Sequence, residues 1–196
     1  MKLAVLQLLV RSDERSERRA LAEATARAVA RGVDAVVSPG GFVLDEAFGL
    51  HAIHALGRVE VLVGDAAIDP VEHARLASAP PDVVVLSPGA ESDIQAEAVF
   101  ELALALSVSL AGLIIISERS GAAPGEPGHG GSAVVLLGEV LAEALSDEDM
   151  LLAEVPVPLF APEPRAPLPE LPPILAQRLA HHRGERPVVQ YPADLS

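Results

Sequence analysis

Two carboxylates stand where reactive side chains are commonly placed in α/β proteins. Asp65 follows the apolar run Val59–Val63 after a single glycine, and Glu118 directly follows the run Leu113–Ser117. Both runs have the length of a strand, and the carboxyl ends of strands are where such proteins gather their functional groups. Two carboxylates in different surroundings can work as acid and base. The same residues are equally consistent with solvated loop positions, so both interpretations stay open.

Four of the six histidines lie in pairs. His51 and His54 are three positions apart and could share one helical face, a spacing that zinc sites use. No third ligand accompanies them in the sequence, so we expect ordinary surface or core histidines and no metal site. His181 and His182 are adjacent, and adjacent residues do not share a helical face, so we expect both to be ordinary surface residues.

Nucleophiles are scarce in this chain. The absence of cysteine excludes disulfides, thiolate metal sites and thiol nucleophiles. Ser38 and Ser87 each precede a proline at the end of a predicted strand, but no motif places a histidine to activate either hydroxyl. We therefore interpret both serines as strand-end caps. The glycine cluster 125–131 lacks the lysine and the strand–turn–helix setting of a phosphate loop, and we expect a flexible loop there.

The net charge of −14 comes from the middle of the chain. Residues 61–157 hold two basic and sixteen acidic residues, whereas residues 1–60 and 158–196 are each balanced. Nucleic-acid binding is not expected, because phosphate contacts need clustered lysine and arginine. We interpret the acidic segment as a solvated face that aids solubility, with a basic protein partner as the alternative.

The length of 196 residues fits one domain with a sizeable core. The first residues lack a cleavage site for export and are predicted to be a buried strand, so we expect a cytoplasmic protein. The longest apolar stretch, Leu102–Ile116, is shorter than the roughly 20 residues that a membrane span needs. No membrane association is therefore predicted.

Apolar runs of strand length alternate with helical patterns over the first 117 residues. The predicted strands cover 2–9, 34–38, 59–63, 82–86 and 113–117. The predicted helices run from a cap at Ser12 or Asp13 to Gly32, over 71–77, and from the capping box Ser92–Gln95 to about Leu110, with a short helix inside 41–57. The long helix is apolar on most sides, so we expect it to be buried on two faces, one of them against another subunit.

The pattern changes after residue 117. Segments 132–137, 140–144 and 151–157 are predicted to be antiparallel strands, which gives two mixed sheets covered by helices. Ten of the 17 prolines then fall between 155 and 196, so residues 156–173 can be neither a helix nor a central strand. We divide the chain into a domain, 1–158, and a Pro-rich C-terminal arm, 159–196, with a helix over 174–183 and a last extended piece over 187–191. The arm wraps a neighbouring subunit, or it packs on its own subunit or is disordered.

Several segments carry a family resemblance. Residues 111–121 form a strand that ends in Glu-Arg-Ser-Gly, and residues 128–142 form a Gly-x-Ser strand, a tight turn and a returning strand. An acidic turn over 146–149 then leads into Leu-Leu-Ala-Glu-Val-Pro-Val. Together these segments resemble the nitrilase, or carbon–nitrogen hydrolase, superfamily, in which the first strand ends in Asn-Arg-x-Gly, so that Glu118 replaces the asparagine. The resemblance covers about residues 2–158 and implies an α–β–β–α sandwich and a homodimer.

The resemblance also implies a vacant catalytic set. Family members hydrolyse or condense amides, ureas or nitriles with a glutamate base, a lysine and a cysteine nucleophile. Their Pro-Glu-x-Phe aligns with residues 39–42 here, which puts Gly40 at the position of the base, and the nucleophile position is Gly64. Only 24 positions separate the two, so the sandwich is predicted to be shortened between its second and third strands. The only lysine of the chain is Lys2.

Two hypotheses follow from this comparison. The first is a catalytically inactive homologue that acts in binding, assembly or regulation, with no catalytic residue, no cofactor, and Asp65 and Glu118 as candidates for lining a residual pocket. The second is a hydrolase of carbon–nitrogen bonds with a rebuilt site that uses Asp65, Glu118 or the histidines. A closed or apolar depression near Gly64 would favour the first, and a polar pocket with convergent carboxylates and a perturbed pKa would favour the second.

Overall fold

The computed structural model of the chain describes residues 1–9, 13–43, 50–121, 129–144, 149–159 and 166–184. The helices are α1 (Glu14–Ala30), α2 (Leu50–Ala55), α3 (Pro70–Ser78), α4 (Asp93–Ser109) and α5 (Pro173–His182), with a 3-10 turn η1 (Gly64–Ile68). The strands are β1 (Lys2–Leu9), β2 (Ala35–Ser38), β3 (Gly41–Phe42), β4 (Val59–Val63), β5 (Val83–Ser87), β6 (Leu113–Ile116), β7 (Arg119–Ser120), β8 (Ala133–Leu136), β9 (Glu139–Glu143) and β10 (Asp149–Glu154). Strands and helices alternate up to β6, as the sequence pattern predicts.

The first sheet has the order β10-β1-β2-β3, and β7 also pairs with β1. Its central strand, β1, runs parallel to β2 and antiparallel to β10, so that Leu3 lies opposite both Ala35 and Ala153. Leu3–Leu8 are all buried, and an apolar run of this kind, interrupted only by Gln7, suits a strand that is covered on both faces. β7 pairs with the last two residues of β1 and brings the segment after β6 to the same end of the molecule.

The second sheet has the order β4-β5-β6-β8-β9. β4, β5 and β6 are parallel, with Val83 opposite both Val59 and Leu113, so their carboxyl ends lie at one edge. β8 and β9 are antiparallel and complete the sheet. Both sheets are therefore mixed, which confirms the fold class predicted from the sequence.

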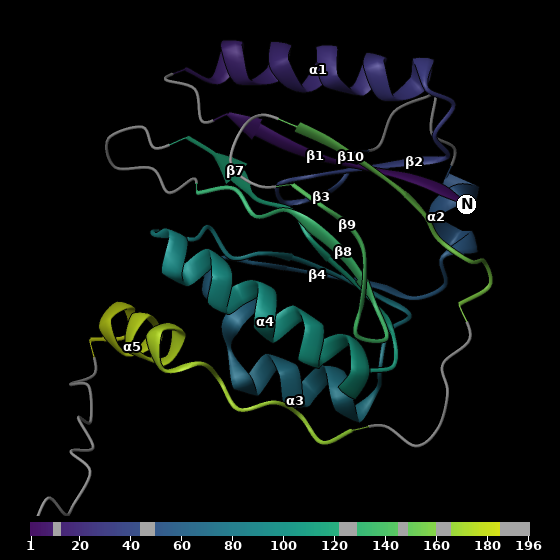
Figure 1. Ribbon diagram of the computed structural model, residues 1–196. Coiled ribbons are helices and arrows are strands. Elements are labelled where there is room, and N and C mark those ends of the chain that lie inside the picture. The colour runs from purple at the N-terminus through teal and green to yellow at the C-terminus, as the bar shows by residue number, and fades with distance from the viewer. Residues whose placement is uncertain (10–12, 44–49, 122–128, 145–148, 160–165, 185–196) are drawn as a thin grey trace, which may run out of the picture.

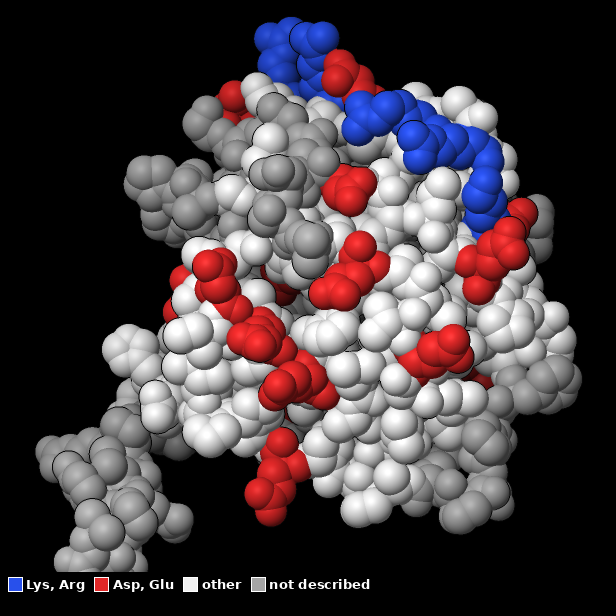
Figure 2. All heavy atoms as spheres, in the orientation of Figure 1, with Lys and Arg blue, Asp and Glu red and all other residues white. Residues whose placement is uncertain are grey.

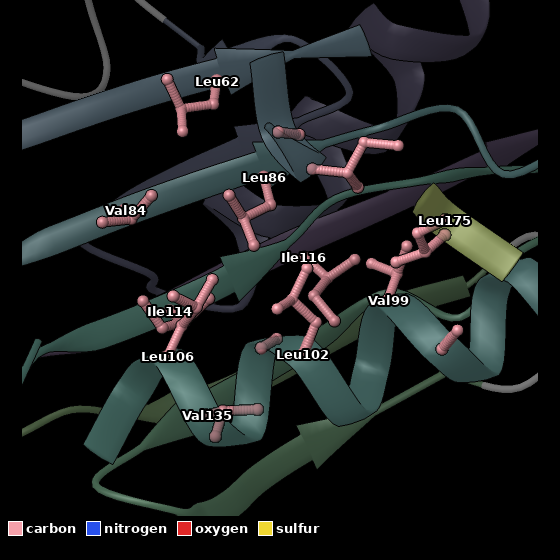
Figure 3. Packing of buried hydrophobic residues seen from close by; sticks show 14 of the residues in the cluster. Leu62, Val84, Leu86, Val99, Leu102, Leu106, Ile114, Ile116, Val135 and Leu175 are labelled. Carbon is pink, nitrogen blue, oxygen red and sulfur yellow. The ribbon is translucent and has the colours of Figure 1, made fainter. Parts of the chain in front are cut away.

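The elements form four layers: α1, the first sheet, the second sheet, and a layer that contains α3, α4 and α5 (Figure 1). Alternate residues of each strand face opposite sides, so the two faces of the second sheet supply two cores. One core lies between the sheets, and the other packs strand residues such as Leu86 and Ile116 against Leu102 and Leu106 of α4 (Figure 3). On the other side, Ala24 and Ala28 of α1 pack against the first sheet. The chain is thus an α–β–β–α sandwich.

Helix starts are fixed by local hydrogen bonds. The Asp13 side chain accepts from the Ser16 amide and caps α1, and Ser92 caps α4 in the same way through the Gln95 amide. The predicted capping box is only half right, because the Gln95 side chain accepts from the amide of Glu91 and not from that of Ser92. Gln95 instead turns towards the segment that precedes the helix.

Three short elements escaped the sequence prediction. β3 and β7 have two residues each, and η1 occupies the start of a segment that had been left without structure. Among them, η1 matters most here, because it continues β4 directly at Gly64.

The part of the C-terminal arm that is described, residues 166–184, packs on its own subunit. The Ser109 hydroxyl donates to the Pro167 carbonyl, and Leu168, Leu171 and Ile174 pack against the core beneath α4. Leu175 of α5 is fully buried in that core. The second face of α4 is thus covered by the same chain, where another subunit had been expected.

Charge is divided between two regions of the surface. In Figure 2, Asp and Glu are spread over the face formed by α4 and its neighbouring strands, whereas Lys and Arg gather over α1. Asp93, Glu97 and Glu101 are exposed along α4. Among the described residues, no helix is both long and apolar enough to cross a membrane.

Candidate functional site

A cavity of about 700 Å³ opens at the carboxyl ends of β2, β4, β5 and β6, beside α5. The parallel strands end at this edge, which is where open α/β sheets commonly bind ligands. Its walls are formed by Pro39, Gly40, Val63, Gly64, Asp65, Ser87, Pro88, Gly89, Glu91, Ser117, Glu118, Arg119, Arg178 and His182. The structure thus brings all four positions singled out in the family comparison, Gly40, Gly64, Asp65 and Glu118, to one cavity.

The two glycines leave open space in the wall. Gly40 has a φ of +99° and Gly64 a φ of +60°, and a Cβ added to either would meet no neighbouring atom within 4 Å. Gly64 lies at the turn from β4 into η1, and a strand-to-helix turn with strained backbone is the arrangement that exposes the nucleophile in α/β-hydrolases. The turn is present in this chain, but it presents no side chain.

Glu118 is the most deeply placed acid of the site. It is 3% exposed, and its Oε1 accepts from the amides of Gly89, at 2.9 Å, and Ala90, at 3.4 Å. Burial raises the pKa of the Glu118 carboxyl to about 7, and the backbone hydrogen bonds and the charge of Arg178 offset this only in part. Glu118 can therefore exchange a proton near neutral pH.

Asp65, in the first turn of η1, is held by two residues of α5. His182 Nδ1 lies 3.0 Å from Asp65 Oδ1, and Arg178 Nη2 lies 3.5 Å from the same oxygen. His182 Nε2 also lies 3.3 Å from Glu91 Oε1. His182 is exposed, as expected of a surface residue, and its ring in addition bridges two carboxylates at the cavity. Its neighbour His181 is exposed, as predicted.

Arg178 is the residue that sequence reasoning missed. It is 8% exposed, and its guanidinium donates to the carbonyl oxygens of Pro88, at 2.6 Å, and Gly89, at 3.0 Å. Buried arginine is rare unless it is paired, and here two carbonyls and Asp65 provide the partners. The one available signal was an arginine on the apolar side of the predicted helix 174–183, four residues before His182.

Hydroxyl groups complete the lining. Ser87 Oγ accepts from the Gly40 amide at 3.0 Å, so this serine caps the backbone of a neighbouring strand end, in line with the predicted role. Ser117 is fully buried, and its Oγ has no hydrogen-bond partner among the described residues. Ser38 lies at the edge of a different, smaller cavity beside α1. No described serine hydroxyl bonds a histidine, so a Ser–His nucleophile pair is not formed there.

The remaining candidates lie away from this cavity. His54 is exposed, and the side chain of His51 lies outside the described part of the chain. No group of three or more potential metal ligands forms among the described residues. Lys2 is at the amino end of β1, where its Nζ donates to the Arg31 carbonyl, so it does not supply the missing lysine of the cavity. Most of the glycine cluster 125–131 lies outside the described residues.

Comparisons with solved structures identify the fold. The crystal structure of an amidase from Nesterenkonia sp. has a TM-score of 0.64 and 16% sequence identity over 80% of this chain and 90% of that chain. A mutant of the Nesterenkonia AN1 amidase, from the nitrilase superfamily, gives the same score and identity over 80% and 92%. A further variant, with acrylamide added at its active-site cysteine, gives a TM-score of 0.63 and 16% identity over 80% and 93%. No family model and no curated protein sequence matches this chain.

The chain has a nitrilase-like fold, shortened between β2 and β4. The Nesterenkonia amidase has an active-site cysteine, to which acrylamide is added in one of its variants. This chain contains no cysteine at all. Its strand-end cavity is instead lined by carboxylates, two arginines, a histidine and hydroxyl groups. The cavity is open, and its lining mixes Pro39, Val63 and Pro88 with these charged and polar side chains, an arrangement between the two that the sequence hypotheses describe.

Proposed function

We propose that this protein binds a small polar molecule in the strand-end cavity and does not carry out the thiol-based hydrolysis of nitrilase-like amidases. The observation that carries the proposal is the open volume at Gly64, in a cavity whose walls carry both apolar and charged side chains. A ligand can occupy the space that a nucleophile and its acyl group would fill. Without a nucleophile, contacts made there stabilise the bound molecule and not an acyl intermediate.

The lack of thiol-based hydrolysis follows from three missing catalytic groups. Gly40 offers no carboxylate, Gly64 offers no thiol, and Lys2 lies at the other end of β1. The glutamate takes the proton, the cysteine attacks the substrate carbon and the lysine stabilises the oxyanion. Without these three groups, no step of the family's acyl transfer can proceed. Binding is therefore the function that the geometry supports best.

The proposal is tested by a panel of short aliphatic amides and nitriles. We expect saturable changes in the amide NMR signals of Gly40, Gly64 and Gly89 for at least one class of small polar compound, and no enzymatic release of ammonia. Ammonia release at an enzymatic rate would overturn the inactive assignment. Absence of any saturable change, with amines and carboxylates added to the panel, would overturn the binding function.

A second candidate is hydrolysis of carbon–nitrogen bonds by an activated water molecule. Glu118 favours it, because a buried carboxyl with a pKa near 7 suits a general base at neutral pH. The water would lose its proton to Glu118 and attack the carbonyl carbon, and the positive Arg178 would lie close to the charge that develops. Collapse of the tetrahedral intermediate would then break the C–N bond, and Glu118 would return the proton to the leaving amine. In that case Glu118→Gln abolishes turnover and Gly64→Ala does not, and the rate rises with pH through about 7.

A further inference from the structure

We infer that the molecule bound in this cavity carries a small organic cation, a primary ammonium or amidinium group, which the carboxylates of Glu118, Asp65 and Glu91 receive. The inference rests on the proposed binding function. The three carboxylates come from the end of β6, from η1 and from the segment before α4, and all of them line the same cavity. Strand ends thus gather three acids that are far apart in the sequence.

The arginines in the cavity wall are largely engaged, although the buried Arg178 Nε has no hydrogen-bond partner among the described residues. Arg178 donates to two carbonyl oxygens and lies beside Asp65. Arg119 forms a salt bridge with Glu17 of α1 at 2.8 Å, which directs it away from the acids of the cavity. Asp65 and Glu91 both contact the His182 ring, yet their side chains remain 37% and 46% exposed, so a ligand cation can reach them from the cavity.

Glu118 and Ser117 form the deepest part of this site. Burial without a close, fully compensating cation is what disfavours the charged form of Glu118, and a ligand ammonium beside it would supply that charge. Next to it, Ser117 Oγ is buried and unpartnered among the described residues, although a buried hydroxyl normally has a partner. An ammonium has three N–H donors and no acceptor, so one carboxylate and one or two hydroxyls match it.

The charge of the surroundings points in the same direction. The segment 61–157, which supplies most of the cavity wall, holds sixteen acidic and two basic residues. A surrounding field of this sign raises the concentration of small cations near the protein, while the cavity wall itself sets three acids against Arg119 and Arg178. The acids over α4 in Figure 2 belong to this segment.

Three probes of similar size distinguish a cationic, a neutral and an anionic ligand: propylammonium, propionamide and propionate. Each is titrated into the full-length protein at pH 8, and the amide signals of Gly40, Gly64 and Gly89 report binding. We expect propylammonium to bind at least tenfold more tightly than either of the others.

Glu118→Gln should weaken the binding of propylammonium about tenfold, because the amide oxygen of the variant can still accept from Gly89 and Ala90 but the negative charge is lost. Glu139→Gln, an exposed site on β9, is the matched control and should change nothing.

The outcomes separate this inference from the function on which it rests. Tighter binding of propionamide or propionate overturns the cationic ligand but leaves a small-molecule site. Absence of saturable shifts with all three probes contradicts both. If Glu118→Gln unfolds the protein, Ser117→Ala provides the second test, and an unchanged affinity for propylammonium in that variant removes Ser117 from the site. Equal weakening of all three probes by Glu118→Gln would also contradict the inference.

Discussion

At the scale of single residues, Glu118 holds the segment after β5 through two backbone amides while its own charge is disfavoured by burial. Its position at a strand end was predictable from the apolar run before it. Its raised pKa was not, because burial depends on Arg178 and on the segment 88–90, which lie far away in the sequence. Gly40 and Gly64 were singled out from the family comparison, and the positive φ of each explains why glycine is well tolerated there.

Glu118 gives the protein a stability that depends on pH. Because the folded-state pKa is raised from 4.5 to about 7, the folded state holds its proton longer, and the Glu118 contribution falls as pH rises between these values. A rise of this size corresponds to about 3 kcal/mol as an upper bound. The free-energy difference between Glu118→Gln and the wild type should therefore shift in favour of the variant from pH 4.5 to 7.5.

Urea unfolding of both proteins at several pH values measures this effect. The difference between the two proteins cancels the contribution of other titrating groups, such as buried His73, whose pKa is lowered by burial. A difference that stays constant between pH 4.5 and 7.5 would show that the Glu118 pKa is not raised.

The open space at Gly64 can be probed by a thiol, because the natural chain has none. Gly64→Cys should react with iodoacetamide at least tenfold faster than Val84→Cys, which places a thiol at a position that is 1% exposed in the core. The left-handed backbone at Gly64 costs the variant about 1–2 kcal/mol of stability. Intact mass gives both rates, and equal rates would contradict an open cavity at this turn.

At the scale of elements, α5 links the Pro-rich arm to the strand-end cavity. The sequence predicted a helix over 174–183, and the structure has Pro173–His182, because helical periodicity and the preceding prolines are local signals. Its docking on α4 was left open, since neither periodicity nor composition states which surface an amphipathic helix covers. Arg178 and His182 reach the cavity only through that docking. For this reason their contacts with residues 65, 88, 89 and 91 were not predictable from the sequence.

Truncation of Leu175 tests whether α5 is part of the core. Leu175 is fully buried, so Leu175→Ala should lower the free energy of unfolding by about 2–5 kcal/mol. Ile94→Ala, at a position that is 66% exposed on α4, should change it by less than about 0.5 kcal/mol. Denaturant titration monitored by circular dichroism gives both values. Similar small losses in the two variants would mean that α5 does not pack on the sandwich in solution.

At the scale of the whole molecule, the four layers follow from patterns that survive large changes in sequence. Buried strands with mainly apolar runs, such as β1, β5 and β6, and the antiparallel return through β8 and β9 were readable without coordinates. The same patterns explain a TM-score of 0.64 at 16% identity, because the sheet needs apolar side chains of suitable size and not particular residues. β3, η1 and β7 were not readable, since elements this short have no periodicity to detect.

A homodimer remains a prediction at this scale. The family resemblance implies one, but the face of α4 that was expected to meet another subunit is covered by α5 and residues 167–171. A second copy would therefore have to use another surface. Light scattering coupled to size exclusion should give twice the chain mass of 20.3 kDa, and a mass of one chain at micromolar concentration would contradict the prediction.

The central claim is that a nitrilase-like framework has kept a ligand-binding cavity and lost the groups that break bonds. The most direct measurement follows butyramide and the protein together by NMR at neutral pH, with ammonia release recorded in the same sample. We predict saturable shifts at Gly40 and Gly64, stronger with propylammonium, while butyramide stays intact. Release of ammonia at an enzymatic rate, abolished by Glu118→Gln, would contradict the claim and identify a rebuilt hydrolase.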